Sequence, residues 1–391
     1  MSYKKWVNAE IDKAKASALS EKLNIDAFVA FLLVSRGIDD ELAASEFLSD
    51  GCRFSSPYLL KDMDKAVKRI NRALDDGESI CIYGDYDCDG VTSTALLYTF
   101  LSALGGFVSY YIPNRATDGY GMNFKAIDKI KADGTDLIIT VDNGISSIEE
   151  AEYIYSLGMQ LIVTDHHQIG ENLPRAEAVI NPHREDNEIE FRDFAGVGVA
   201  FKLACALYDG DVEDLLEDYA DYVTIGTIGD MVPLLNENRA IVKSGLKLIN
   251  TDAKIGISAL KKSTNSKAEH FSATDVAFQI CPRINAAGRM DTANLAVDLL
   301  TCEDNEIAEY KAEQLNLENT HRHEVEEKID KDIAEIMAND RAYQTDRVIV
   351  VAGHNYHKGV IGICAAHLVE LYSKPAIVIG IDDEGNATGS A

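Results

Sequence analysis

The chain has 391 residues, 46% of them hydrophobic, which is enough to bury the cores of two or more domains. Its formal net charge of −28 excludes non-specific binding to polyanions, so any nucleic acid would have to be held by metal ions and a few locally placed arginines. The sequence contains no run of about 18 apolar residues, and its N-terminal stretch lacks the apolar segment of a signal peptide. Its seven cysteines lack the spacing of a disulfide framework, so we expect a reduced, cytoplasmic protein.

The N-terminal 60 residues are expected to be helical and carry no chemical motif. From about residue 78, short β-branched runs that end in polar residues alternate with amphipathic stretches. This alternation predicts an α/β fold with a mainly parallel sheet, helices on both faces, and ligands beyond the carboxyl ends of the strands. The expected strands lie within 79–85, 106–112, 136–142, 160–165 and 176–182, and helices within 93–104 and 146–158.

The second half begins with a mostly helical region that ends in one long helix from Asn305 to about Asn339. The runs DRVIVVAG, GVIGICAAHLVELY and PAIVIGI then predict a second, smaller α/β lobe with a strand–helix–strand unit. A lone unit of this kind is a poor domain, so we expect the natural protein to continue beyond it. The expected divisions are an N-terminal helical segment (1–60), a first α/β domain (61–235), a helical connector (236–344) and the second α/β domain (345–391).

The run YGDYDCDG places Asp85, Asp87 and Asp89 at alternate positions after the first expected strand. Carboxylates this close repel one another, which indicates a bound cation. An EF-hand calcium loop is excluded because its twelfth position, counted from Asp85, is Leu96 rather than glutamate, and because the motif follows a strand. Gly90 is expected to let the backbone pass closely behind the ligands. The next helix is expected to begin at residues 92–94, where its N-terminus can favour a phosphate.

Two further strand ends and one helical stretch carry the same kinds of side chain. Asp142 ends the run DLIITVD, Asp165, His166 and His167 follow the next strand, and Asp230 lies in the helical stretch YVTIGTIGDMVPL. Taken alone, an aspartate at a strand end is more often a helix cap than a metal ligand. A pair of adjacent histidines is more often a chance occurrence of surface or capping residues. Because the carboxyl ends of parallel strands meet at one edge of a sheet, we expect these residues to form one site.

The combined residues suit a pair of divalent ions. Carboxylate oxygens mixed with imidazole nitrogen favour manganese or a similar metal, and the number of ligands fits two ions about 3.5–4 Å apart, as in two-metal phosphoester hydrolysis. Asp142, on the middle of the three strands, is the expected bridging ligand, and water is the nucleophile. Residues 87–91 also resemble the first motif of haloacid-dehalogenase-type phosphatases, but the later acidic pair of that family is not evident. The spacing of these residues alone therefore predicts a two-metal phosphoesterase but does not identify its substrate.

Motifs between about residues 80 and 365 carry a family resemblance. DYDCDG, VDNG, TDHH and IGTIGDM occur here in the order found in the DHH phosphoesterase superfamily, and YYIPNRATDGYGMN, INPHR, FAGVGVAFKLACAL, PRINAAGRM and GHNYHKGVIGICAAHL extend the match. Within the superfamily the chain resembles the bacterial single-stranded-DNA-specific exonucleases. The resemblance implies a 5′-to-3′ exonuclease that releases mononucleotides during DNA repair and recombination and uses two manganese or magnesium ions.

By motif match, the resemblance assigns roles to individual residues. Asp142, His166 and His167 are catalytic, with His167 orienting the scissile phosphate or stabilising its charge, and Asp165 orienting a neighbouring imidazole. Asp85 either binds a metal directly or supports the metal ligands without contacting the metal itself. The implied metal ligands are Asp85, Asp87, Asp89, Asp142, His166 and Asp230.

The resemblance also indicates which positively charged side chains bind DNA in this acidic protein. Arg115 and Arg283 are expected to grip the 5′-terminal phosphate through bidentate hydrogen bonds, assisted by Arg289. A structural alternative exists for Arg115 as a turn residue and for Arg289 as part of an ion pair. Tyr120 is expected to stack on a base, although a tyrosine between glycines also serves as a loop anchor. Contacts to the DNA backbone are expected from His354, His357 and Lys358.

Two other functions stay open. One is a phosphodiesterase for short RNA or a cyclic dinucleotide, and the other is a non-catalytic DNA-binding scaffold, against which the cost of burying so many carboxylates argues. Single-stranded DNA, a helicase and single-strand-binding protein are the implied partners of a cytoplasmic monomer that does not contact membranes. The family's glycine- and serine-rich motif breaks off at residues 389–391 and its oligonucleotide-binding barrel is absent, so a catalytic core with its active site between two lobes is expected.

Overall fold

The first lobe is built on a five-stranded sheet. The computed structural model describes residues 7, 10–49, 54–115, 118–119, 121–208, 210–290, 292–340 and 342–391. The strand order is β2-β1-β3-β4-β5, and every neighbouring pair is parallel, which confirms the predicted fold class. The strands are β1 (Ser79–Tyr83), β2 (Phe107–Tyr111), β3 (Leu137–Val141), β4 (Gln160–Thr164) and β5 (Ala178–Ile180).

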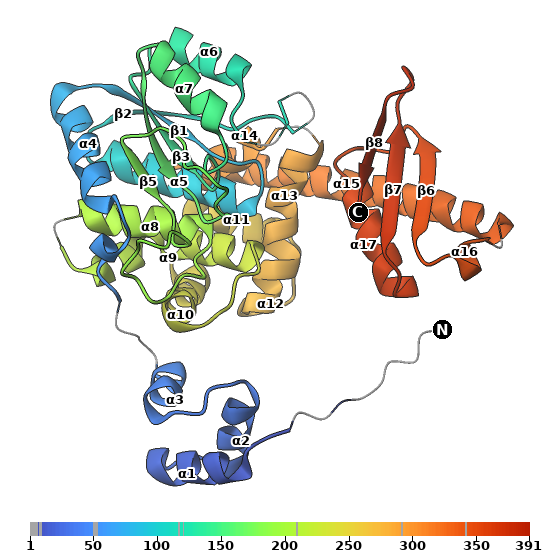
Figure 1. The fold of residues 1–391 in the computed structure, drawn as a ribbon, viewed down its shortest axis with the longest axis horizontal. Coiled ribbons are helices and arrows are strands. Elements are labelled where there is room, and N and C mark those ends of the chain that lie inside the picture. The colour runs from blue at the N-terminus through green and yellow to red at the C-terminus, as the bar shows by residue number, and fades with distance from the viewer. Residues whose placement is uncertain are drawn as a thin grey trace.

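Helices cover both faces of this sheet (Figure 1). Successive side chains of β1 alternate between two cores, because neighbouring residues of a strand point to opposite faces. Ile80 and Ile82 pack with α4 (Met63–Asp76), α5 (Cys88–Ala103) and α8 (Gly196–Leu207). Cys81 and Tyr83 pack in the other core, which contains buried residues of α6 (Phe124–Ala132) and α7 (Ile148–Ser156). The central strands are therefore buried on both faces and read as continuous apolar runs.

Helix α5 begins earlier than the sequence predicts. Its first residue is Cys88 rather than one of residues 92–94, because the Asp87 side chain accepts hydrogen bonds from the backbone N–H groups of Asp89 and Gly90 and caps the helix. The aspartate motif is thus itself the N-terminus of the helix. The expected role of Gly90 is confirmed, since a Cβ at this position would lie 2.5 Å from the Asp85 carbonyl oxygen.

A helical region connects the two lobes. Its longest helix, α15 (Asn305–Asn339), has the predicted bounds and runs from the first lobe into the second (Figure 1). It packs against α11 and α13 at one end and against α17 and β6 at the other. The connector also contains α10 (Asn236–Thr251), α11 (Ile255–Ser263), α12 (Ala273–Asp275), the π-helical turn Val276–Ile280, α13 (Cys281–Met290) and α14 (Asn294–Leu300). The remaining elements are a 3₁₀ turn (Pro57–Leu59) before α4, α9 (Val212–Gly229) before α10, and α16 (Ala342–Thr345) after α15.

The second lobe is a three-stranded sheet with one covering helix. The predicted strand–helix–strand unit is present as β6 (Ile349–His354), α17 (Ile361–Tyr372) and β7 (Ala376–Ile381), with the two strands parallel. The sequence did not indicate β8 (Ala387–Ser390), which pairs antiparallel with β7. Ile333 and Met337 of α15 belong to the core of this lobe, so the long helix is part of its packing.

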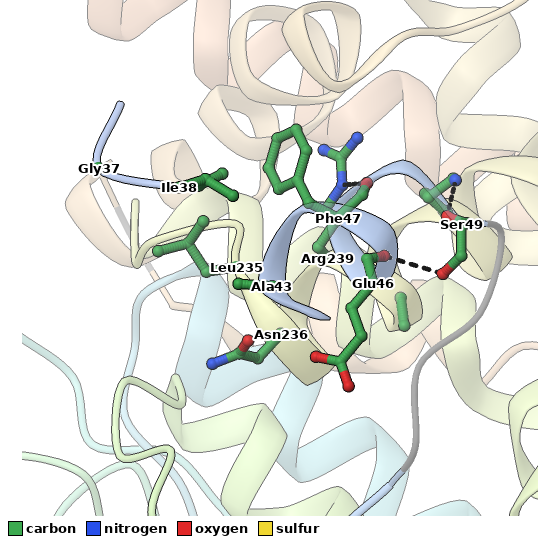
Figure 2. Close-up of a pocket in the computed structure, with 11 residues that line it drawn as sticks. Gly37, Ile38, Ala43, Glu46, Phe47, Ser49, Leu235, Asn236 and Arg239 are labelled. Carbon is green, nitrogen blue, oxygen red and sulfur yellow. Dashed lines mark hydrogen bonds between the residues drawn. The ribbon is translucent and has the colours of Figure 1, made fainter. Parts of the chain in front are cut away.

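The N-terminal helices form a small cluster that is set apart from the first lobe (Figure 1). The cluster comprises α1 (Lys13–Leu23), α2 (Ala27–Ser35) and α3 (Glu41–Leu48) and has its own small core. It is attached through α10: the Arg239 guanidinium lies 3.9 Å from the Phe47 ring centroid, and its Nε donates to the Phe47 carbonyl. Figure 2 shows this contact beside a cavity of about 180 Å³ that lies away from the aspartate motif. Among the described helices, none has the length and apolar composition to cross a bilayer.

Candidate metal centre

Three neighbouring strands bring acidic and imidazole side chains to one edge of the first sheet. β3 lies between β1 and β4, and Asp85, Asp142 and Asp165 each follow the carboxyl end of one of these strands. Asp230 reaches the same place as the C-cap of α9. The predicted convergence of the strand ends is therefore present, with Asp142 in the middle.

The potential ligand atoms fall into three overlapping groups, and within each group the atoms lie within 4.8 Å of one another. His166 links the groups, because its Nε2 lies 3.1 Å from Asp142 Oδ1, 3.8 Å from Asp89 Oδ2 and 3.7 Å from Asp230 Oδ2. All the residues expected to bind metal thus lie in one cluster. The groups are Asp89, His166 and Asp230; Asp85, Asp87 and Asp142; and Asp142, His166 and His167, which joins the first two.

Burial and mutual repulsion disfavour the charged forms of these carboxyl groups. Desolvation, followed by the neighbouring carboxylates, raises the pKa of Asp89 and of Asp142 well above the ordinary value. Burial and the charge of Asp87 raise the pKa of Asp85 to about 7 and that of Asp230 to about 6. A cluster with this electrostatic cost is stabilised by cations placed among its oxygens.

Two buried atoms in the cluster face each other without a hydrogen bond. Asp142 Oδ1 and His166 Nε2 have no hydrogen-bond partner among the described residues, although they are 3.1 Å apart. Burial and the neighbouring His167 lower the pKa of His166 to about 4, so its imidazole is neutral at pH 7 and can bind a metal. Hard carboxylate oxygens with a neutral imidazole nitrogen fit manganese-like divalent ions.

Asp165 holds the second histidine of the pair. Its Oδ1 lies 2.7 Å from His167 Nδ1 and also accepts the backbone N–H groups of His166 and His167, while Oδ2 accepts Ile145 N–H. Burial alone would raise the pKa of Asp165, but the hydrogen bond from His167 and those from the backbone lower it. The same hydrogen bond raises the pKa of His167, whose side chain is 45% exposed. This is the orienting contact that the sequence predicts for Asp165.

Close packing fixes two of the aspartates. Asp142 has a left-handed backbone with φ of 59°, a conformation that aspartate tolerates better than most residues. Asp89 is fully buried and accepts hydrogen bonds from the first N–H groups of α8, at 2.5 Å from Gly196 N and 2.8 Å from Val197 N. A Cβ at Gly226 of α9 would lie 2.9 Å from Asp89 Oδ1. Asp89 therefore caps α8 as well as facing the cluster.

A cation-lined groove of about 480 Å³ lies beside the cluster, between the two lobes. Arg115, Arg289, His357 and Lys358 all line it. Arg115 lies 5.3 Å from the Tyr86 ring centroid, and Arg289 Nη1 donates to the Gly359 carbonyl at 2.9 Å. Burial and the charge of Arg115, which lines the same groove, lower the pKa of Arg289.

Other predicted substrate-binding residues are placed differently. Arg283 does not line the groove: its Nε donates to Asn316 Oδ1 of α15 at 3.0 Å, and its Nη1 donates to the Gln279 carbonyl at 2.7 Å. His354 ends β6 with an exposed side chain and also lies outside the groove lining. Tyr120 falls outside the described residues.

Sequence reasoning missed a residue that supports the histidine loop. The fully buried Asn181 donates from Nδ2 to the His167 carbonyl at 2.9 Å and accepts the His183 N–H through Oδ1. Its position directly after β5, the neighbour of β4, was the available indication, because adjacent parallel strands end side by side.

Comparison with known proteins agrees with this geometry. The DHH family, N-terminal domain, matches residues 79–227. A crystal structure of exonuclease RecJ bound to manganese superposes with a TM-score of 0.74 at 33% identity, covering 86% of this chain and 84% of that chain. This chain belongs to the RecJ family.

Other RecJ proteins match nearly the whole chain. The Bacillus subtilis single-stranded-DNA-specific exonuclease RecJ is 41% identical over 389 residues, which cover 99% of this chain and 49% of that protein. The structure of RecJ in complex with Mn²⁺ from Thermus thermophilus gives a TM-score of 0.81 at 30% identity, covering 98% of this chain and 55% of that one. The chain thus spans about half the length of the Bacillus RecJ that it matches.

Proposed function

We propose that this chain is the catalytic core of a single-stranded-DNA-specific 5′-to-3′ exonuclease that releases 5′-mononucleotides in DNA repair and recombination. The observation that carries the proposal is the pair of ligand groups joined at Asp142 and His166, directly beside a groove lined by arginines. The names of the RecJ relatives, which are single-stranded-DNA-specific exonucleases, support this substrate and reaction.

Two sets of residues would hold the two metal ions, and Asp142 lies between the sets, with its Oδ1 3.1 Å from His166 Nε2. Asp85 and Asp87 offer oxygens on one side, and Asp89, His166 and Asp230 offer atoms on the other. When bound, two manganese or magnesium ions supply the Lewis acidity that activates water and neutralises charge on the phosphate. The manganese- and magnesium-bound structures of related RecJ proteins support this choice of ions.

His167 acts on the scissile phosphate. Its Nδ1 is held by Asp165, and the hydrogen bond raises the pKa of the imidazole, so the ring carries more positive charge near neutral pH. The ring is also partly exposed, which allows contact with a phosphate. His167 thereby orients the phosphate and stabilises the charge that develops on its oxygens.

The groove supplies the polarity of digestion. Arg115 and Arg289 grip the 5′-terminal phosphate, and Lys358 and His357 contact the backbone of the strand. The charge of Asp87 opposes the lowering of the pKa of Arg289, and Gly288, which precedes Arg289, packs on the backbone of Tyr86 beside Asp87. Holding the 5′ end there sets the next phosphodiester at the ligands. The groove between the lobes also favours a single strand over a duplex.

The test is the release of mononucleotides from a 5′-phosphorylated single strand with separate labels at its two ends, in Mn²⁺. The 5′ label should appear first, and Asp142→Asn should abolish release, since asparagine tolerates the left-handed backbone but removes the charge. Asp252→Asn, which changes an exposed carboxylate at the end of α10, is the matched control.

Three outcomes would overturn the proposal or one of its parts. First release of the 3′ label would reverse the polarity. No release by folded, metal-loaded protein at low salt would favour the alternatives, a phosphodiesterase for short RNA or a cyclic dinucleotide, or a DNA-binding scaffold. Blunt duplex degraded as fast as single strand at matched salt would remove the selectivity.

The setting of the activity is part of the same proposal. The chain works as a cytoplasmic monomer with helicase and single-strand-binding protein as partners, and the free thiols of all the described cysteines are compatible with a reducing compartment. Its divisions are the N-terminal helices, the metal-binding domain, the helical connector and the second α/β domain, with the expected boundaries at residues 60, 235 and 344. Light scattering and limited proteolysis test the monomer and the boundaries.

A further inference from the structure

One face of α13 lies against the metal-binding turn. Cys281, Asn285 and Gly288 share this face, because they are four and three residues apart along a helix. Cys281 Sγ and Cys88 Sγ both contact the Ile225 carbonyl, at 3.5 and 3.8 Å. A Cβ at Gly288 would lie 2.2 Å from the Tyr86 carbonyl oxygen, so the helix packs directly on the backbone of the aspartate motif.

Asn285 makes a specific polar contact from this face. Its Oδ1 accepts the backbone N–H of Cys88 at 2.8 Å, across 197 residues of sequence. A backbone N–H can only donate, so the side-chain atom that faces it is the carbonyl oxygen of the amide. The orientation of the amide is therefore determined by chemistry.

This contact completes the N-terminus of α5. The first N–H groups of a helix have no partner within the helix. The Asp87 side chain accepts those of Asp89 and Gly90, which leaves the N–H of Cys88, the first helical residue, for Asn285. Cys88 lies between Asp87 and Asp89, which belong to different ligand groups.

We propose that Asn285 is a positioning residue of the metal centre. By holding the Cys88 N–H, it sets the orientation of the turn that directs Asp87 and Asp89 to their two metal positions. The inference rests on the proposed metal site and goes beyond it, because Asn285 is assigned no contact with metal or substrate.

The position of Asn285 is itself fixed from the other side of the groove. Arg289, one helical turn further along α13, donates to the Gly359 carbonyl of the second lobe. A Cβ at Gly359 would lie 2.3 Å from the Arg289 carbonyl oxygen, so the two segments pack closely. The π-helical turn Val276–Ile280 immediately precedes α13. α13 is thus held between the metal-binding turn and the second lobe.

The test measures Mn²⁺ affinity of the purified chain from the free-Mn²⁺ signal in electron paramagnetic resonance, which does not depend on turnover. Asn285→Leu keeps the size of the side chain but removes the acceptor, and it should weaken Mn²⁺ binding by about 10- to 100-fold, the usual cost of losing a group that orients metal ligands. Asn285→Asp keeps an acceptor at the same place and should restore most of the affinity.

Asn250→Leu is the matched control. Asn250 Oδ1 accepts the Phe271 N–H at 2.7 Å, 21 residues away, so this variant also loses an amide contact to backbone but away from the metal ligands. It should lower the melting temperature without changing Mn²⁺ affinity. Wild-type affinity in folded Asn285→Leu, or an equal loss in Asn250→Leu, would overturn the inference. If the wild-type chain itself bound no Mn²⁺, the proposed metal site would be wrong. Failure of the metal site is therefore distinguishable from failure of the role proposed for Asn285.

Discussion

Gly196 lies directly against Asp142. A Cβ at position 196 would be 2.6 Å from the Asp142 Cβ and 2.9 Å from its Cα, closer than two such atoms can approach. The first N–H of α8 at this glycine also donates to Asp89 Oδ2. The absence of a side chain at Gly196 therefore lets α8 start beside Asp142 and hold Asp89 at the same time.

Gly196→Ala should accordingly disturb the metal centre more than the fold. The new methyl group forces Asp142 or the start of α8 to move, so we expect Mn²⁺ affinity and nuclease rate to fall by about 10-fold or more, as for other losses of ligand orientation. Titration calorimetry and single-strand digestion measure the two effects. Gly170→Ala is the control, because a Cβ there meets no atom within 4 Å. Equal affinities in the two variants would contradict the expectation.

Metal binding should weaken as the pH falls through the range of the raised carboxyl pKa values. The pKa of Asp85 is about 7 and that of Asp230 about 6, so in the metal-free protein at pH 6 Asp85 is mostly protonated and Asp230 is about half protonated, and a cation must displace these protons. Because these pKa values are raised, the metal-free fold loses stability as pH rises towards 7, and cations restore it. The increase in melting temperature on adding Mn²⁺ should therefore be larger at pH 7.5 than at pH 6. An increase that is independent of pH would show that these carboxyl groups do not bind the metal.

Arg115→Ala should discriminate between DNA ends. A charged hydrogen-bonding contact contributes roughly 1.5–3 kcal/mol, so the variant should lose about 10- to 100-fold in kcat/KM on a 5′-phosphorylated strand and much less on a 5′-hydroxyl strand. Arg175→Ala is the matched control, since Arg175 also stacks on a tyrosine, at 4.1 Å from the Tyr155 ring centroid, but on the exposed surface and outside the groove. Equal losses on both DNA ends would place Arg115 elsewhere on the strand.

Glu237→Ala should destabilise the protein without touching the metal ligands. Glu237 Oε2 lies 2.5 Å from Lys202 Nζ, and both side chains are buried. Removing one partner of a buried ion pair leaves an uncompensated charge and costs about 3–5 kcal/mol in the free energy of unfolding. Chemical denaturation measures this, with Glu309→Ala as control, because its ion pair with Lys262 is exposed and contributes at most about 1 kcal/mol. Similar losses in both variants would contradict the prediction.

Much of the candidate site could be predicted from sequence because its ligands follow strands. Parallel strands end at a common edge, so Asp85, Asp142 and Asp165 were expected to converge once the strands were recognised. The strands themselves are short β-branched runs whose burial on both faces leaves a clear pattern. The start of α5 was misplaced because Asp87 was considered as a ligand only, whereas its side chain also caps the helix.

The remaining features depend on contacts between residues that are far apart in the chain. Arg115 and Arg283 look equally suited to a phosphate in sequence, but only Arg115 lines the groove, because the far side of α13 directs Arg283 towards α15. Asn285 meets Cys88 only when α13 packs on the first lobe.

The sequence by itself therefore determined the strands, the order of the motifs and the chemical nature of the ligands, because these follow from local periodicity and residue type. Only the tertiary structure decided which cations face the metal centre and which side chains orient its ligands. Those choices depend on how whole helices pack against the sheet, and that packing minimises the free energy of the entire chain rather than of any one segment.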